Sequence, residues 1–269
     1  MKCTLRALPF LLVMALFLCA CQPVMPVETT ASAAQEEILV QGAPLRWPKG
    51  LGVDSHGKLI VGDFLNRSIF LVDPDTGDIL GRYGSEQGVD VPDIIAVGTD
   101  DAIYWTAWGN SDICRIQADG TKKCQAVGDG ASSIGFNDEG RLFAGAQASL
   151  YEVDPDLESP PVHIVNVEGS IAPFDFGPDG RLYIPDDGIE SIVRVDVDAE
   201  QAIAETIASS DLPWAFSVGF DSEDQLHCVV SYDEYTVAFV RVDTETGEVH
   251  EAWRAPAGLG QPVFTQDGR

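Results

Sequence analysis

One short phrase recurs six times along this chain of 269 residues. Each complete copy contains an apolar segment, a tight polar turn and a second apolar segment, as in "LGVDSHGKLIVGD" at Leu51–Asp63. The residues that end the turns are 39 to 44 positions apart: Gly57, Asp101, Gly140, Gly180, Asp224 and Gly268. A period of this size, made of strand–turn–strand units, is typical of propeller blades. The repeats therefore predict an all-β, six-bladed β-propeller with four antiparallel strands per blade.

The sixth copy, Val263–Arg269, stops after its turn, whereas other copies continue into an apolar strand such as Leu182–Ile184. We therefore expect the sixth blade to be incomplete in this chain. A blade without its middle strands would leave unpaired backbone edges, which closed rings avoid. The expectation is either a full sequence that continues further or a five-bladed ring with a frayed end.

The first residues are predicted to be an export signal rather than part of the fold. Lys2 and Arg6 precede an apolar run, Leu8–Phe17, that is too short to span a bilayer stably. The run ends in "LCAC", which resembles the lipobox of bacterial lipoproteins, so Cys21 would carry the lipid; the alternative is an ordinary signal peptide with a chance cysteine. Residues 1–20 are thus assigned to the signal, 21–37 to a flexible tether without large apolar content, and 38–269 to the propeller. The predicted location is extracytoplasmic, on a membrane, through Cys21.

The chain is strongly acidic, with 43 Asp and Glu against 16 Lys and Arg and a formal net charge of −27. Such a field repels phosphate backbones and anionic lipid, which excludes nucleic-acid binding and leaves the lipid as the only membrane contact. Many acids lie in turns such as Asp73–Gly77, Asp154–Asp156 and Asp243–Gly247. These turns are too short for the six or more oxygen ligands of a calcium loop, so we interpret the acids as turn formers.

Cys114 and Cys124 lie on either side of Ala118-Asp119-Gly120. If this triplet forms a three-residue hairpin loop, the two cysteines face each other directly, within disulfide range. A two-residue Asp-Gly turn would shift the register by one residue and prevent the bond. An oxidising destination favours the disulfide. Cys228, in an apolar strand, is expected to be a buried free thiol.

In a four-stranded meander, successive connections alternate between two ends. The first and third connections of each blade share one face, here called the turn face, and the second connections and inter-blade links share the other, the loop face. Longer and more varied loops make the loop face the expected ligand face. The candidate ligand-binding residues on it are Lys49, Asp63, Asn66, Asp93, Trp108, Asn110, Ser132, Asp186, Asp187, Trp214, Tyr232 and Asp233. Trp105 is expected on the same face. For both Trp105 and Trp214, the alternative to ligand binding is packing between blades.

The segment Trp47–Gly84 resembles the NHL repeat in its Pro-x-Gly opening, Asp-x-x-Gly turn, Asp…Asn-Arg loop and closing Gly-x-x-Gly. Phe174–Asp196 is similar to the same superfamily, which includes SMP-30/gluconolactonase proteins and streptogramin lyases. The likeness extends from about Leu45 to Arg269. The resemblance implies a six-bladed propeller. It does not imply one activity, because related propellers include binding proteins, hydrolases and lyases.

Gluconolactonase-type enzymes hold a divalent cation on the axis with ligands about eight residues before the turn residue. The corresponding positions here are Lys49, Asp93, Ser132, Ala172, Phe216 and Gly260. Asp93 is the one carboxylate among them, and therefore the one metal ligand expected if a metal site exists. A lysine ammonium at the neighbouring position would repel a hard cation. We thus predict no cofactor, with Ca²⁺ an alternative that these positions do not support.

Two hypotheses about function follow. The first is a lipid-anchored binding or scaffolding propeller without catalytic residues, whose loop face takes a small molecule, a sugar or a peptide through aromatic stacking and hydrogen bonds. The alternative is a divalent-metal-dependent lactone or ester hydrolase of the SMP-30/gluconolactonase type.

Overall fold

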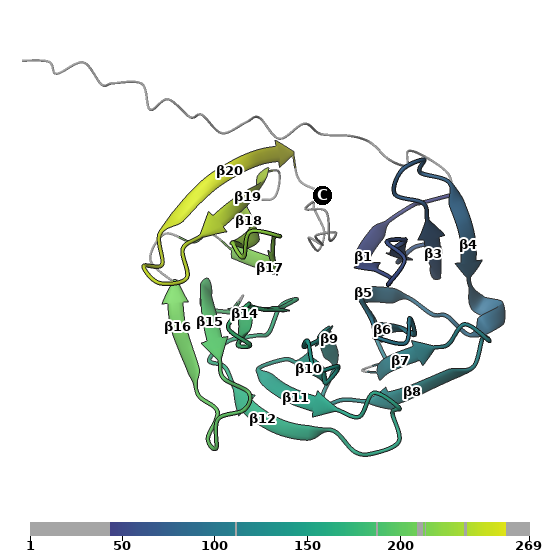
Figure 1. Ribbon diagram of the computed structural model, residues 1–269, viewed down its shortest axis with the longest axis horizontal. Coiled ribbons are helices and arrows are strands. Elements are labelled where there is room, and N and C mark those ends of the chain that lie inside the picture. Colours follow the sequence, from purple (N-terminus) through teal and green to yellow (C-terminus); the bar gives the residue numbers. More distant parts are fainter. Residues whose placement is uncertain are drawn as a thin grey trace, which may run out of the picture. The chain divides into compact units, whose positions relative to one another are not determined.

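The computed structural model describes residues 44–256, apart from 111, 187, 209–211, 213 and 234–235. In this part of the chain, twenty strands form five separate four-stranded antiparallel sheets, with one short 3₁₀ helix, η1 (Ser85–Gln87). The sheets radiate from a common axis, and the first strand of each sheet lies nearest to it (Figure 1). The described residues include no helix that is long and apolar enough to cross a bilayer. The protein is therefore an all-β propeller.

Each blade uses four consecutive strands. Blades 1 and 2 consist of β1 (Pro48–Val53), β2 (Leu59–Asp63), β3 (Ser68–Val72), β4 (Ile79–Tyr83), β5 (Pro92–Val97), β6 (Ile103–Ala107), β7 (Asp112–Ile116) and β8 (Lys122–Ala126). Blade 3 consists of β9 (Ala131–Phe136), β10 (Leu142–Ala146), β11 (Ser149–Val153) and β12 (Val162–Asn166). Blades 4 and 5 consist of β13 (Asp175–Phe176), β14 (Leu182–Asp186), β15 (Ser191–Val195), β16 (Ala204–Ala208), β17 (Trp214–Phe220), β18 (Leu226–Asp233), β19 (Thr236–Val242) and β20 (Val249–Pro256).

The prediction of six blades is wrong: the described residues form five sheets. Each of the first five sequence repeats supplies one complete sheet, from β1 to β20. The sixth phrase, Val263–Arg269, lies outside the described residues. A turn phrase is not sufficient evidence for a blade, because a phrase contains one turn and its flanks whereas a blade needs four paired strands.

The repeated turn joins the first two strands of every blade. In blade 1, the Asp54 N–H donates to the Lys58 carbonyl at 3.0 Å and the Gly57 N–H to the Asp54 carbonyl at 3.0 Å. Gly57 adopts φ +79°, in the left-handed region that glycine enters without strain. Asp101 and Asp224 take the same position in blades 2 and 5, with φ of +59° and +62°. Aspartate tolerates this conformation, which explains why each of the five turns has either glycine or aspartate there.

The hydrophobic core lies between neighbouring blades. Ile60 and Ile69 of blade 1 pack with Ile95, Ile103 and Trp105 of blade 2, and the Trp105 side chain is fully buried. Burial of such side chains supplies most of the stabilisation of a propeller, since each sheet buries apolar residues on both faces. The interpretation of Trp105 as core packing is thus confirmed.

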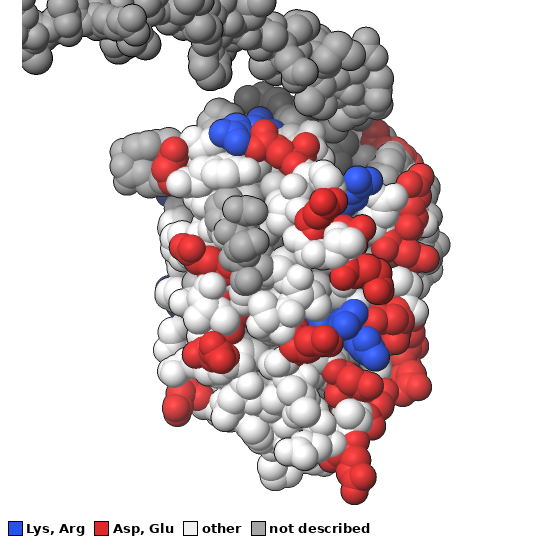
Figure 2. Space-filling view, turned by 90° about the vertical axis from the view of Figure 1, so that its left-hand side faces the viewer, with Lys and Arg blue, Asp and Glu red and all other residues white. Residues whose placement is uncertain are grey.

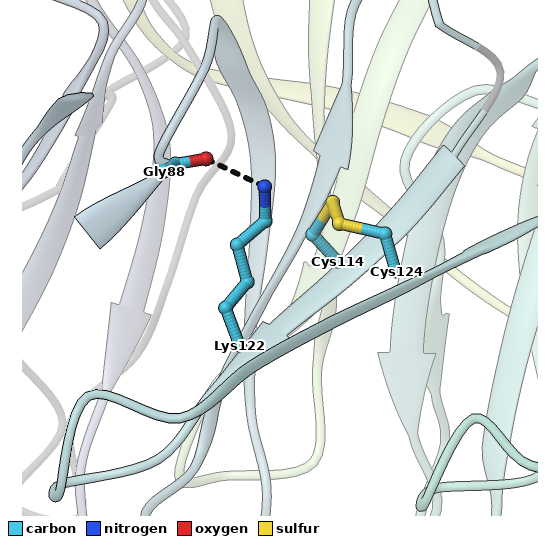
Figure 3. The surroundings of a disulfide bond; sticks show 4 residues. All are labelled: Gly88, Cys114, Lys122 and Cys124. Carbon is cyan, nitrogen blue, oxygen red and sulfur yellow. Dashed lines mark hydrogen bonds between the residues drawn. A yellow bond between two sulfur atoms is a disulfide. The ribbon is translucent and has the colours of Figure 1, made fainter. Parts of the chain in front are cut away.

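The predicted disulfide joins Cys114 of β7 to Cys124 of β8 (Figure 3). Gln117 and Thr121 pair across the hairpin, with the Gln117 N–H donating to the Thr121 carbonyl at 3.0 Å, so the loop has three residues. This register places Cys114 directly opposite Cys124. In the same strand, the Lys122 ammonium donates to the Gly88 carbonyl at 2.6 Å, which joins the outer strand to the link between blades 1 and 2. Cys228 is a buried free thiol, as predicted.

Acidic side chains of the turn face hold the turns themselves. The Asp73 carboxylate accepts the N–H groups of Asp75 and Thr76 at 2.9 and 3.1 Å, and Asp243 binds the equivalent N–H groups in blade 5 at 2.9 and 2.7 Å. These N–H donors lower the pKa of both carboxyls. Figure 2 shows acidic residues gathered toward one side of the molecule. The interpretation of these acids as turn formers is supported by their contacts.

Candidate functional site

The strand order assigns the two faces as expected. In each blade, the turn between the first and second strands and the turn between the third and fourth strands lie on the turn face. The loop between the second and third strands and the link to the next blade lie on the loop face. The inner strands therefore begin at the loop face. All of the described candidate residues lie in second loops, in links or at strand ends on this side, whereas Asp187 lies outside the described residues.

A β-bulge occurs near the start of four inner strands. The register of β1 against β2 shifts between Pro48 and Gly50, which leaves Lys49 as the bulged residue. The corresponding shifts in β5, β9 and β17 include Asp93, Ser132 and Phe216. A bulge re-aims the side chain of the extra residue and ends regular pairing. The positions eight residues before the turn are thus structurally equivalent, and their side chains leave the regular sheet alternation.

Lys49 and Asp93, from blades 1 and 2, form an ion pair across the blade boundary. Lys49 Nζ lies 2.5 Å from Asp93 Oδ1, and the two side chains are 32% and 8% exposed. Gly50 permits the approach, because a Cβ there would lie 2.3 Å from the Asp93 carbonyl oxygen. The buried Asp93 carboxylate is therefore neutralised by a cation that the chain itself supplies.

Three aromatic side chains, here called the aromatic row, continue from this pair: Trp47, Phe64 and Trp108. The rings of Trp47 and Phe64 have centroids 5.4 Å apart, and those of Phe64 and Trp108 lie 6.2 Å apart in an edge-on arrangement. Lys49 Nζ lies 5.2 Å from the ring centroids of both Phe64 and Trp108. Trp47 and Trp108 are 52% and 61% exposed. The row is a solvent-accessible aromatic surface beside a partly buried ion pair.

Asp63 is completely buried, and its carboxylate is occupied by backbone donors. Oδ2 accepts the Arg46 N–H at 2.6 Å, and Oδ1 accepts the Asn66 N–H at 2.9 Å. The Trp47 N–H lies 3.3 Å from both oxygens. The Asn66 amide donates to the Pro44 carbonyl. Asp63 and Asn66 therefore hold the segment that leads into blade 1, and so they position Trp47.

Asp186 has the same role in blade 4. Its buried carboxylate accepts the N–H groups of Gly169 and Ser170 at 3.0 and 2.8 Å. Gly169 is required here, because a Cβ would lie 2.1 Å from Asp186 Oδ1. The carboxylate joins the end of β14 to the link from blade 3.

Ser132 also spans a blade boundary, since its hydroxyl donates to the Ile171 carbonyl at 2.9 Å. Asn110 is exposed, and its N–H donates to the Ala107 carbonyl at 3.2 Å, which closes the loop that carries Trp108. Ser132 therefore forms a structural hydrogen bond between blades, and Asn110 presents its side chain to solvent near the aromatic row.

Blade 5 contributes a second aromatic group. Trp214 is 49% exposed and packs against Phe216 with the ring centroids 4.9 Å apart and the ring planes tilted by 40°, so it is not a core residue like Trp105. The Tyr232 hydroxyl donates to Glu251 at 3.1 Å, and the Arg254 guanidinium lies 4.3 Å above the Tyr232 ring. Burial, followed by the contact with Glu251, raises the pKa of Tyr232. Asp233, the last residue of β18, is exposed beside it.

The residues at the six positions that precede the turn residues by eight do not fit the divalent-cation site implied by the resemblance to gluconolactonase-type enzymes. Of the equivalent positions, Lys49 is a cation, Ala172 and Phe216 have no oxygen in their side chains, and Gly260 lies outside the described residues. Asp93 is engaged by Lys49. Within the described ranges, no three His, Cys, Asp or Glu side chains come together as a metal-binding group. A hard divalent cation needs several oxygen ligands, which this set does not supply.

A cavity of about 260 Å³ lies on the axis, lined by the turn-proximal halves of the five inner strands. Among the described residues that line it, Asp175 is the one ionisable residue. Its carboxylate accepts the N–H groups of Phe220 and Phe176, both at 2.9 Å, and burial raises its pKa to about 6. The contact with Phe220 joins the inner edges of blades 4 and 5.

Asp175 was not among the candidate residues predicted from the sequence. A usable signal was nonetheless available five residues before each turn residue, where the other blades have glycine or alanine. These small residues are Gly52, Ala96, Gly135 and Gly219. A single aspartate at a position otherwise reserved for small residues marks a departure from the repeat.

No protein-family model matches the chain, and no curated protein matches it. Solved structures do resemble it. A gluconolactonase from Xanthomonas campestris has a TM-score of 0.69 and 15% sequence identity, over 83% of this chain and 81% of that protein. A virginiamycin B lyase from Staphylococcus aureus has a TM-score of 0.61 and 16% identity, over 76% of this chain and 69% of the lyase.

A PQQ-bound aldose sugar dehydrogenase from Streptomyces coelicolor is also similar, with a TM-score of 0.61 and 16% identity over 80% of this chain and 83% of the dehydrogenase. These three proteins have different activities, and identities this low establish the fold alone. The chain thus has the propeller fold found in gluconolactonases and virginiamycin B lyases, as the sequence resemblance implied.

Proposed function

We propose that this protein is an exported binding propeller that captures a small ligand at its loop face without transforming it. The observation that carries the proposal is the aromatic row of Trp47, Phe64 and Trp108 beside the Lys49–Asp93 pair. Exposed aromatic rings next to a buried charge supply stacking and orientation. Asp63 and Asn66 hold the row in place through backbone contacts.

The ligand classes that suit this surface are a sugar, a cationic metabolite or a peptide with an apolar face. Sugars and alkyl groups stack on tryptophan and phenylalanine faces, and cations are attracted to them. The formal charge of −27 disfavours nucleic acid as a partner. Attachment of Cys21 to a lipid would display the propeller on a membrane through the tether 21–37, and both lie outside the described residues.

The test uses the mature protein and a panel of neutral sugars, sugar acids, and primary and quaternary amines. We expect at least one class to raise the melting temperature of the wild type and to quench its tryptophan fluorescence. Trp108→Ala should lose this response, whereas Leu80→Ala should keep it, because Leu80 is 51% exposed on β4, away from the row. A response that Trp108→Ala leaves unchanged would contradict the proposed site.

The second candidate is a divalent-metal-dependent lactone or ester hydrolase, which the structural likeness to gluconolactonases favours. The Lys49 ammonium on Asp93 argues against it, because this charge occupies the one carboxylate of the expected ligand set. Metal-dependent turnover of an aldonolactone distinguishes the two candidates.

A further inference from the structure

We propose that Phe64, Trp108 and Asp93 form a cage for an organic ammonium group, and that Lys49 is its built-in occupant. This inference rests on the proposed function and deepens it by naming the ligand class. The Lys49 ammonium lies 2.5 Å from Asp93 and 5.2 Å from each of two ring centroids. A carboxylate and aromatic rings around one cation are the elements by which proteins recognise quaternary ammonium ligands.

The walls of the cage are held independently of Lys49. The Phe64 N–H donates to the Trp47 carbonyl at 2.9 Å, and the Trp108 N–H donates to the Val91 carbonyl at 3.2 Å. The Asp93 carboxylate belongs to an inner strand and is nearly inaccessible to solvent. Removal of the lysine side chain would therefore leave an open cage with a negative charge at its base.

Val91 gives a second reason to regard this cage as built for a task. It adopts φ +40°, a conformation that is strained for a β-branched residue, in the link that leads into β5. Its carbonyl is the acceptor that fixes Trp108, and Asp93 follows two residues later. Backbone strain of this kind persists where the surroundings impose it, and it concentrates at ligand sites.

Lys49 can leave the cage more easily than the walls can move. It is the bulged residue of β1, its side chain is one-third exposed, and its four-carbon stem is flexible. A primary ammonium is strongly hydrated, so its transfer to aromatic surroundings carries a desolvation penalty. A quaternary ammonium is weakly hydrated and covers both rings with its methyl groups. Such a ligand should compete with Lys49 for the cage.

The experiment measures choline binding by calorimetry and by tryptophan fluorescence in wild type and Lys49→Ala. We expect Lys49→Ala to bind choline at least about tenfold more tightly than the wild type, because the competing occupant is gone. The neutral isostere 3,3-dimethylbutan-1-ol should bind both proteins more weakly than choline does. Adding Trp108→Ala to Lys49→Ala should abolish the gain, and adding Leu80→Ala should not.

Melting curves establish that each variant is folded. If Lys49→Ala is not, Lys49→Met retains most of the stem and serves as the second variant. Equal binding of choline and its neutral isostere, or no choline binding by a folded Lys49 variant, would overturn the cage. If sugars then still bind in a Trp108-dependent manner, the proposed function stands and only the cation assignment fails. If nothing in the panel depends on Trp108, both fail.

Discussion

Asp63 and Asp186 end the second strands of blades 1 and 4, and each binds backbone N–H groups of the segment that leads into its own blade. Both residues are completely buried. The equivalent residues of the other blades are Ala107, Ala146 and Val230. The carboxylate therefore reinforces two of the five blades, and in blade 1 it also positions the aromatic row.

Replacement of this carboxylate should destabilise the fold. We expect Asp63→Ala to lower the free energy of unfolding by roughly 2–4 kcal/mol, because several buried N–H groups lose a charged acceptor. Asp63→Asn retains one acceptor oxygen and should lose less. Urea unfolding measures the difference, and Asp78→Ala, an exposed turn residue, is the matched control. A loss no greater than that of the control would show that the contacts of Asp63 are dispensable.

Asp175 should make stability depend on pH in the direction opposite to the turn carboxylates. Its pKa is raised to about 6 by burial, above the ordinary value near 3.8, so the folded state binds the proton more tightly than the unfolded state. The free energy of unfolding that this group contributes is greatest below pH 4. It decreases, by up to about 3 kcal/mol, as the pH rises to 6 and beyond.

The measurement compares wild type with Asp175→Asn in urea at pH 4.5 and 7.5. The asparagine variant should be relatively more stable at pH 7.5, since it no longer buries a charge and can still accept the Phe220 N–H. Glu245→Gln, at an exposed turn position, controls for the change in net charge. A pH-independent difference between wild type and Asp175→Asn would rule out titration of Asp175 in this range.

The disulfide between Cys114 and Cys124 should stabilise blade 2 moderately. It closes a short loop between strands that already pair, so Cys124→Ser should lower the free energy of unfolding by about 1–3 kcal/mol. Peptide mapping without reductant should recover the two cysteines linked. Cys228→Ala leaves the link intact and serves as the control, and two free thiols in the mapped wild type would contradict the assignment.

We expect no calcium- or zinc-dependent hydrolysis of a simple aldonolactone above background. The reason is the donor set: Asp93 is paired with Lys49, and the equivalent residues Ala172 and Phe216 offer no side-chain oxygen. A spectrophotometric assay with and without chelator measures this, with a gluconolactonase as the positive control. Metal-dependent turnover that Asp93→Ala abolishes would favour the hydrolase instead.

Much of the architecture could be predicted locally. The spacing of Gly57, Asp101 and the later turn residues predicted four-stranded antiparallel units, because a tight turn that accepts positive φ between apolar segments specifies a hairpin. The pairing of Cys114 with Cys124 was predicted on the condition that the loop between them has three residues, and the structure has this loop. Such features depend on residues close in sequence, so a repeat pattern is enough to reveal them.

The candidate site could be predicted only in outline. Alternation of the connections placed Lys49, Asp93 and Trp108 on one face, yet it did not bring them together. Their contact depends on bulges in two inner strands and on the close approach at Gly50. A bulge shifts the register by one residue without a clear sequence signal, so the direction of these side chains could not be predicted.

Local periodicity and turn chemistry were enough to predict the all-β repeat, the order of strands within each blade and the two faces. They also predicted the disulfide on the condition that its hairpin loop has three residues. Other features became visible only in the folded chain: five sheets form, Asp63 and Asp186 are buried and hold backbone N–H groups, Asp175 faces the axial cavity, and Lys49 lies among Asp93, Phe64 and Trp108. Each of these depends on contacts between residues of different elements, because the burial and the partners of a side chain are set by which elements pack against it. A repeat pattern does not encode these contacts one residue at a time.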